Sequence, residues 1–120
     1  MKRDMDIVRY ILQRKEADEL LDTTLYPLDV LLHHVVLMQE GGLIEAETTL
    51  DQSGKVNSAD IKRLTNAGYD FLDASSDNQI WQMAKEKILK PGASWTFDLL
   101  LAWLKQEIAR RWTGGPPPVS

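Results

Sequence analysis

The chain has 120 residues, of which 43% are hydrophobic and 27% are charged. This is enough for one buried core and too few for two full domains. There is no cysteine, which excludes disulfide bonds, thiolate nucleophiles and cysteine-rich zinc sites. No segment approaches the ~20 apolar residues of a membrane-spanning helix, and the first residues lack the apolar core of a signal peptide. We therefore expect a cytoplasmic protein without membrane contact.

The formal net charge of −4 is unevenly distributed along the chain. Residues 1–15 carry a net charge of +3, and residues 55–120 carry +2. Residues 16–54, between them, hold nine carboxylates and no Lys or Arg. This segment predicts an acidic surface, which would attract cationic partners.

Two helices are expected before the glycines at residues 41–42. Asp4 suits the N-cap of the first helix, whose apolar face is formed by Ile7, Val8, Ile11 and Leu12. Pro27 suits the first turn of the second helix, and the glycine pair ends it. On this second helix the apolar side gathers Leu28, Leu31, Leu32, Val35 and Met38. The opposite side presents Asp29, His33 and Glu40.

A β-hairpin is expected at about residues 43–64. Residues 43–50 alternate between apolar and polar side chains, and Glu45 and Glu47 fall on the polar side. Asp-Gln-Ser-Gly at residues 51–54 is typical of a turn, so residues 56–64 return as the second strand. The hairpin also carries three cations, Lys55, Lys62 and Arg63.

Three further helices are expected after the hairpin. Thr65 caps the first, residues 75–77 interrupt it, and the next helix runs to Pro91 and Gly92. Thr96 caps the last helix, whose apolar stripe is Phe97, Leu100, Leu101, Leu104, Ile108 and Trp112. Residues 113–120 read Thr-Gly-Gly-Pro-Pro-Pro-Val-Ser and predict a disordered tail. Residues 1–112 are thus expected to form a single domain.

The helix before the expected hairpin ends in Gln-Glu-Gly-Gly-Leu-Ile at residues 39–44. After the hairpin, residues 64–73 read Leu-Thr-Asn-Ala-Gly-Tyr-Asp-Phe-Leu-Asp. This order of elements and motifs resembles the winged-helix pattern. The resemblance implies a mainly α fold with a small β-hairpin, a modified helix-turn-helix plus wing, and extra C-terminal helices. In that superfamily the helix before the hairpin is the recognition helix and the hairpin is the wing.

Further segments carry a second resemblance. Residues 1–6 read Met-Lys-Arg-Asp-Met-Asp, a histidine precedes the Gly-Leu-Ile turn at residues 42–44, and Leu-Thr-x-x-Gly-x-x-Phe-Leu-Asp spans residues 64–73. Ile-Trp and Ala-Lys-Glu-Lys follow at residues 80–81 and 84–87. With these features the chain resembles, over residues 1 to about 112, an uncharacterised bacterial and phage family of the domain-of-unknown-function type. This resemblance implies a fold and no activity.

Two features depart from a winged helix that reads DNA. Residues 15–26 are too few for an ordinary second helix with its turns, so the helix-turn-helix is incomplete. The helix at the recognition position has no Lys or Arg, although phosphate binding depends largely on these cations.

The residues do not indicate catalysis. His33 and His34 are the only histidines, and neighbouring helical residues point about 100° apart, so they are poorly placed to serve one metal or one catalytic centre. His34 is expected at the border of the apolar face with one ring nitrogen satisfied, and His33 in solvent. No carboxylate spacing or phosphate-loop motif is present. We expect neither an enzyme nor a bound metal or cofactor.

The sequence therefore favours a non-enzymatic binding module, a phage-associated regulator or inhibitor of a host system. Its acidic face, which would bind a protein partner, comprises Asp29, His33, Glu40, Glu45 and Glu47. The alternative is a transcriptional regulator that binds duplex DNA with the wing and the first helix, with phosphate contacts on the hairpin from Lys55, Lys62 and Arg63. On the last helix, Leu99 and Trp103 lie outside the apolar stripe, which suits either a homodimer interface or packing beneath the preceding helix.

Overall fold

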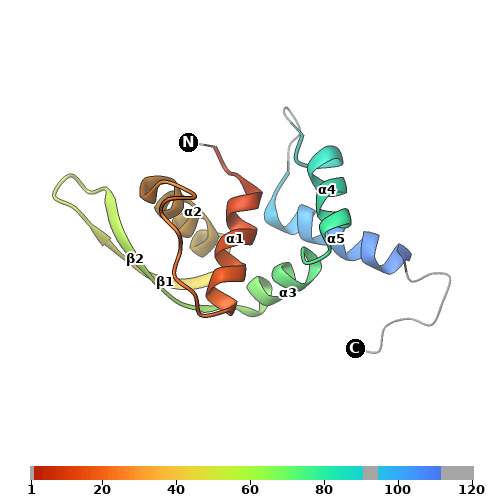
Figure 1. Cartoon of the computed structure of the whole chain (residues 1–120), viewed down its shortest axis with the longest axis horizontal. Coiled ribbons are helices and arrows are strands. Elements are labelled where there is room, and N and C mark those ends of the chain that lie inside the picture. Colours follow the sequence, from red (N-terminus) through yellow and green to blue (C-terminus); the bar gives the residue numbers. More distant parts are fainter. Residues whose placement is uncertain (1, 91–94, 112–120) are drawn as a thin grey trace. The chain divides into compact units, whose positions relative to one another are not determined.

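The computed structural model describes residues 2–90 and 95–111. These residues form, in chain order, α1 (Met5–Glu16), α2 (Leu28–Glu40), β1 (Ile44–Leu50), β2 (Val56–Leu64), α3 (Asn66–Ala74), α4 (Asn78–Lys87) and α5 (Phe97–Arg111) (Figure 1). The mainly helical fold with one antiparallel hairpin is confirmed. The expected helix stop at residues 91–92, Trp112 and the expected tail at residues 113–120 lie outside the described residues.

The chain divides into two compact units, Met1–Leu72 and Asp73–Ser120. Unit 1 holds α1, α2, the hairpin and most of α3, and unit 2 holds the end of α3 with α4 and α5. That residues 1–112 act as one domain stays a prediction.

In unit 1, α1 begins as expected, because the Asp4 side chain accepts a hydrogen bond of 2.9 Å from the backbone N–H of Asp6. The apolar residues predicted for α1 are all buried. On α2 the prediction is wrong at two positions. Pro27 is the N-cap rather than a first-turn residue, and Leu28 keeps 53% of its surface exposed.

His34 ties α2 to the start of α1. It is only 1% exposed, and its Nε2 accepts a hydrogen bond of 2.8 Å from the backbone N–H of Asp4. Its Nδ1 lies 2.8 Å from the carbonyl oxygen of Val30, so the neutral ring with the proton on Nδ1 satisfies both contacts. The prediction of one satisfied nitrogen is therefore wrong, because both are bonded and the side chain is structural.

The hairpin pairs Ile44 with Leu64 at its base and Leu50 with Val56 near its tip, with irregularities in register after Glu45 and after Thr49. Only the base is buried, whereas residues 47–50 are exposed. The turn is closed by Asp51, whose carboxylate accepts hydrogen bonds from the Ser53 hydroxyl and from two backbone N–H groups.

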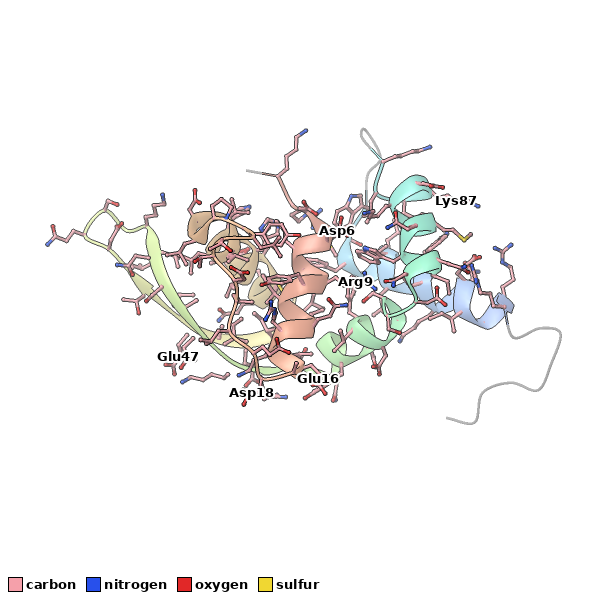
Figure 2. The ribbon with its side chains drawn as sticks, in the orientation of Figure 1. Asp6, Arg9, Glu16, Asp18, Glu47 and Lys87 are labelled. Carbon is pink, nitrogen blue, oxygen red and sulfur yellow. The ribbon has the colours of Figure 1, made fainter. Side chains whose placement is uncertain are left out.

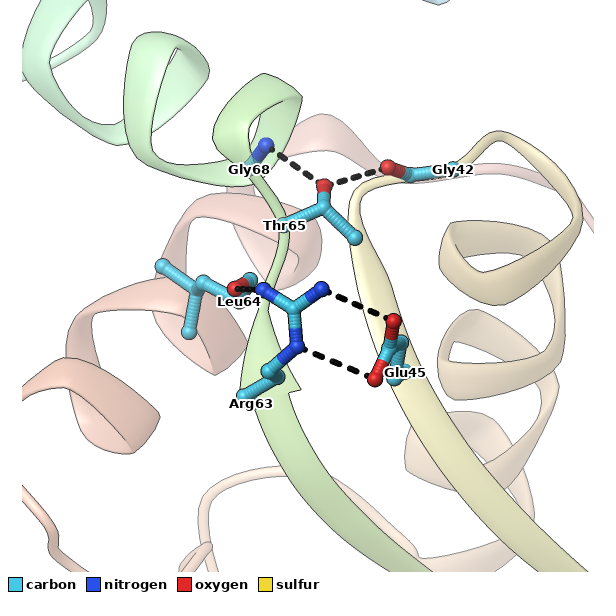
Figure 3. A network of polar contacts seen from close by, with 6 residues as sticks. All are labelled: Gly42, Glu45, Arg63, Leu64, Thr65 and Gly68. Carbon is cyan, nitrogen blue, oxygen red and sulfur yellow. Dashed lines mark hydrogen bonds and ion pairs between the residues drawn. The ribbon is translucent and has the colours of Figure 1, made fainter.

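Thr65 and Gly68 join α3 to the base of the hairpin (Figure 3). The Thr65 hydroxyl donates to the Gly42 carbonyl and accepts from the Gly68 N–H at 3.1 Å. The Thr65 N–H donates to the Leu43 carbonyl at 3.0 Å. A Cβ at Gly68 would lie 2.0 Å from that same carbonyl oxygen, so only glycine allows the helix to approach so closely.

In unit 2, α4 packs against α5. Asp77 caps α4 by accepting from the N–H groups of residues 79 and 80, at 2.8 and 3.0 Å. Thr96 caps α5 as expected, since its hydroxyl accepts from Leu99 N–H at 3.1 Å. The buried stripe of α5 includes Glu107, which pairs with Arg110, and the apolar pattern gave no sign of it.

Candidate protein-binding groove

The hairpin cations are paired with carboxylates on the same hairpin. Arg63 makes two hydrogen bonds to Glu45, at 2.8 and 3.0 Å (Figure 3). The Nζ of Lys62 lies 2.6 Å from Asp60 and 3.8 Å from Glu47. The hydrogen bond to Glu45 raises the pKa of Arg63, and the hydrogen bond to Asp60 raises the pKa of Lys62.

Lys55, the third cation, lies at the hairpin tip beside Asp51. The pKa of Asp51 is lowered, chiefly by the hydrogen bond from Ser53 and then by the Lys55 N–H. All three candidate DNA contacts are thus exposed residues with a carboxylate neighbour. A phosphate would have to compete with those carboxylates for each of them.

The five residues of the expected acidic face lie on two elements. Asp29 and Glu40 are exposed at opposite ends of α2, roughly 16 Å apart along the axis at ~1.5 Å per residue. His33 is half-buried on the same helix, its ring edge-on to His34 at 5.4 Å. Glu45 and Glu47 are exposed on β1, where they share the cations described above. Of the five, Asp29 and Glu40 therefore carry the acidic character of α2 itself.

Sequence reasoning missed a cavity of about 460 Å³ in unit 1, called here the loop–hairpin groove. Its lining comes from α1 and the following loop (Lys15, Asp18, Glu19, Leu20, Leu21, Thr23), from α2 (Leu28, Leu31, Leu32, Val35) and from residues 57–61 of β2. The volume falls within the range typical of ligand pockets. Figure 2 shows where the chain leaves α1, at Glu16 and Asp18.

Exposed leucines border this groove. Leu20 is 91% exposed and Leu28 is 53% exposed, and both line it. The carboxylates of Asp18 and Glu19 line the same groove, and residues 16–27 contain four carboxylates and no Lys or Arg. Apolar surface bordered by charge is typical of sites that bind other proteins. The sequence feature that could have indicated this groove is the series of leucines inside the acidic segment. These leucines do not follow a helical period, so a search for amphipathic helices does not detect them.

The loop at residues 17–27 contains no helix, as the short spacing predicted, and α1 holds it in place. The Glu19 N–H donates to the Arg14 carbonyl at 2.9 Å, and the two side chains form an ion pair of 2.7 Å. The Tyr10 hydroxyl accepts from the Asp22 N–H at 2.8 Å, and the Tyr10 ring packs edge-on against Tyr26. These contacts with α1 therefore hold in place the loop that lines one side of the groove.

In unit 2, Leu99 is 50% exposed and Trp103 is half-buried on α5. Across residues 2–90 and 95–111, no group of three His, Asp or Glu side chains is arranged to hold a metal ion. No helix in the same part of the chain is long and apolar enough to cross a bilayer.

In the described part of the chain these features define a mainly helical protein with one β-hairpin and a groove bordered by exposed leucines. Residues 2–94 match the family of hypothetical proteins called DUF2513, and the chain belongs to that family. The match contains every residue that lines the groove. No curated protein and no solved structure matches the chain.

Proposed function

We propose that this protein is a non-enzymatic binding module that recognises a cationic segment of a protein partner through the loop–hairpin groove and the acidic residues around it. In the bacterial or phage setting implied by the resemblance, it acts in the cytoplasm as a regulator or inhibitor of a host system. Its architecture is interpreted as a modified winged helix, in which the loop at residues 17–27 takes the place of the second helix.

The groove is the observation that carries this proposal. Its lining includes the exposed side chains of Leu20 and Leu28 together with the carboxylates of Asp18 and Glu19. A partner with an apolar anchor flanked by Lys or Arg would bury the anchor and place its charges beside carboxylates. Burial of one leucine-sized anchor contributes about 1.5–3 kcal/mol before the entropic cost of association. The charges mainly steer the encounter and select the partner.

The rival function, binding of duplex DNA, requires free cations. Each phosphate contact made by a Lys or Arg adds to affinity and to salt dependence. In the hairpin, Lys62 and Arg63 are bonded to Asp60 and Glu45. Exposed ion pairs of this kind contribute little, so they weaken phosphate binding without abolishing it. The pairing thus favours a protein partner.

A pull-down from nuclease-treated bacterial lysate, with bound proteins identified by mass spectrometry, tests this proposal. The groove variant is Asp18→Lys, at an exposed residue that lines the groove, and Asp98→Lys, at an exposed residue in unit 2, is the matched control. We expect a basic protein to be retained by the wild type and the control and lost with the groove variant. Retention that disappears on nuclease treatment, with a gel shift strengthened by the groove variant, would support the DNA-binding alternative instead.

A further inference from the structure

β2 has a free edge facing the groove. The sheet has two strands in the described part of the chain, so β2 pairs with β1 along one side only. Five consecutive residues of β2, from Asn57 to Ile61, line the groove. Side chains alternate between the two faces of a strand, so consecutive residues border one cavity only when the cavity runs along the strand edge.

The loop opposite does not cover this edge with backbone bonds. Among the described residues, no backbone hydrogen bond joins residues 17–27 to residues 57–61. Pairing with β1 is regular from Ser58 to Ile61, between the two register irregularities, so every second N–H and C=O group of these residues points away from β1, toward the free edge. The segment is about 17 Å long at ~3.4 Å per residue, which matches five residues of an added strand.

We infer that the β2 edge from Asn57 to Ile61 accepts an extended segment of the partner as a third strand. This inference rests on the proposed function and specifies how the partner binds. Backbone hydrogen bonds to β2 would give affinity, and alternate side chains would give selectivity.

The surroundings of the edge define the segment that fits. One face of the added strand would meet the apolar side of the groove on α2, where Leu28 is the exposed residue. The other face would lie beside Asp60 and the loop carboxylate of Asp18. A segment that alternates apolar and basic residues satisfies both faces.

A second copy of the chain is a poorer occupant. Pairing two β2 edges would bring two loops together, each with three carboxylates and no Lys or Arg. Like charges at close range oppose such pairing. A cationic partner segment meets three carboxylates in the groove lining, Asp18, Glu19 and Asp60, against one lysine, Lys15.

The test uses a synthetic seven-residue peptide of alternating lysine and valine, blocked at both ends, titrated into the full-length ¹⁵N-labelled protein and followed by NMR. Two further peptides carry N-methyl groups on all lysine amides or on all valine amides. In a strand, the amides of alternate residues point to opposite edges. We therefore expect one methylated peptide to bind like the parent and the other to lose about tenfold or more in affinity, with shifts centred on residues 57–61.

The protein variants are matched by exposure. Leu28→Lys alters a half-exposed groove residue, and Leu50→Lys alters one that is 58% exposed on the hairpin and does not line the groove. We expect Leu28→Lys to weaken binding about tenfold and Leu50→Lys to leave it unchanged. A peptide with glutamate in place of lysine should not bind.

The outcomes separate the two proposals. Groove shifts with equal affinities for both methylated peptides would overturn strand addition while leaving the groove as the partner site. Shifts that avoid the groove, or no shift at millimolar peptide, would overturn both proposals. Dilution-dependent shifts at residues 57–61 without peptide would mean that a second copy occupies the edge, which also overturns the inference.

Discussion

Gly68 provides a sharp test of how α3 meets the hairpin. A Cβ there would lie 2.0 Å from the Leu43 carbonyl oxygen and 3.3 Å from the Leu64 Cβ, whereas such carbon–oxygen contacts normally exceed about 3.3 Å. The Gly68→Ala variant must therefore shift the Leu43 carbonyl or the helix by roughly 1.3 Å. That carbonyl accepts the Thr65 N–H, so the shift also disturbs the start of α3.

The size of the effect follows from three contributions. Overpacking costs about 1–3 kcal/mol, and weakening the Thr65 hydrogen bond adds about 1 kcal/mol. The higher helix propensity of alanine offsets about 1 kcal/mol of this loss of stability. The net loss is about 1–3 kcal/mol, which corresponds to a fall in Tm of about 5–15 °C for a chain of this size. Gly68→Leu should lose more.

Thermal unfolding followed by circular dichroism measures this, with Ala67→Gly as the control. Ala67 is exposed in the same helix, so its replacement costs only the propensity difference of about 1 kcal/mol. A Tm that is unchanged or raised in Gly68→Ala would refute the close approach of α3 to the hairpin.

Three further predictions concern other contacts. His34→Leu should cost about 1–3 kcal/mol, because the Asp4 N–H loses its acceptor and the Val30 C=O loses the imidazole donor. Faster amide exchange at Asp4 checks this. Because the folded-state pKa of Asp51 is lowered, its stabilising effect is present above about pH 4 and lost as the pH falls through that folded value. Asp51→Asn should flatten the loss of stability measured in that range. Leu99→Asp should shift a homodimer to monomer in sedimentation if α5 forms the interface.

For each of these three predictions, one experimental result would contradict it. Unchanged exchange at Asp4 would mean that His34 does not hold the start of α1. Equal acid sensitivity of Asp51→Asn and the wild type would mean that the turn bonds are not formed in solution. A sedimentation coefficient that is the same for Leu99→Asp and the wild type at every concentration would argue against self-association through α5.

The elements of this fold are encoded locally, which is why the sequence predicts them. The Asp4 cap, the glycines after α2 and the Thr65 cap each depend on residues within one or two turns. Alternation at residues 44–50 likewise predicts a strand without knowledge of its partner.

The contacts that sequence reasoning missed join distant residues. The Arg63–Glu45 pair depends on hairpin register and its bulge, which alternation does not fix. The second bond of His34 comes from Asp4, thirty residues away. The groove depends on where an aperiodic loop rests against α1 through Tyr10, so no periodic pattern marks it.

Site-specific photo-crosslinking tests the central claim most directly, namely that the loop–hairpin groove binds a cationic protein segment. A benzoylphenylalanine replaces Leu20, which is 91% exposed at the groove, or Leu99 on α5 as the control. After irradiation in bacterial cells and nuclease treatment, we expect an adduct with a different protein from position 20 alone, mapped by mass spectrometry to a segment of net positive charge. Adducts from position 99 but not 20, or adducts that vanish with nuclease, would contradict the claim.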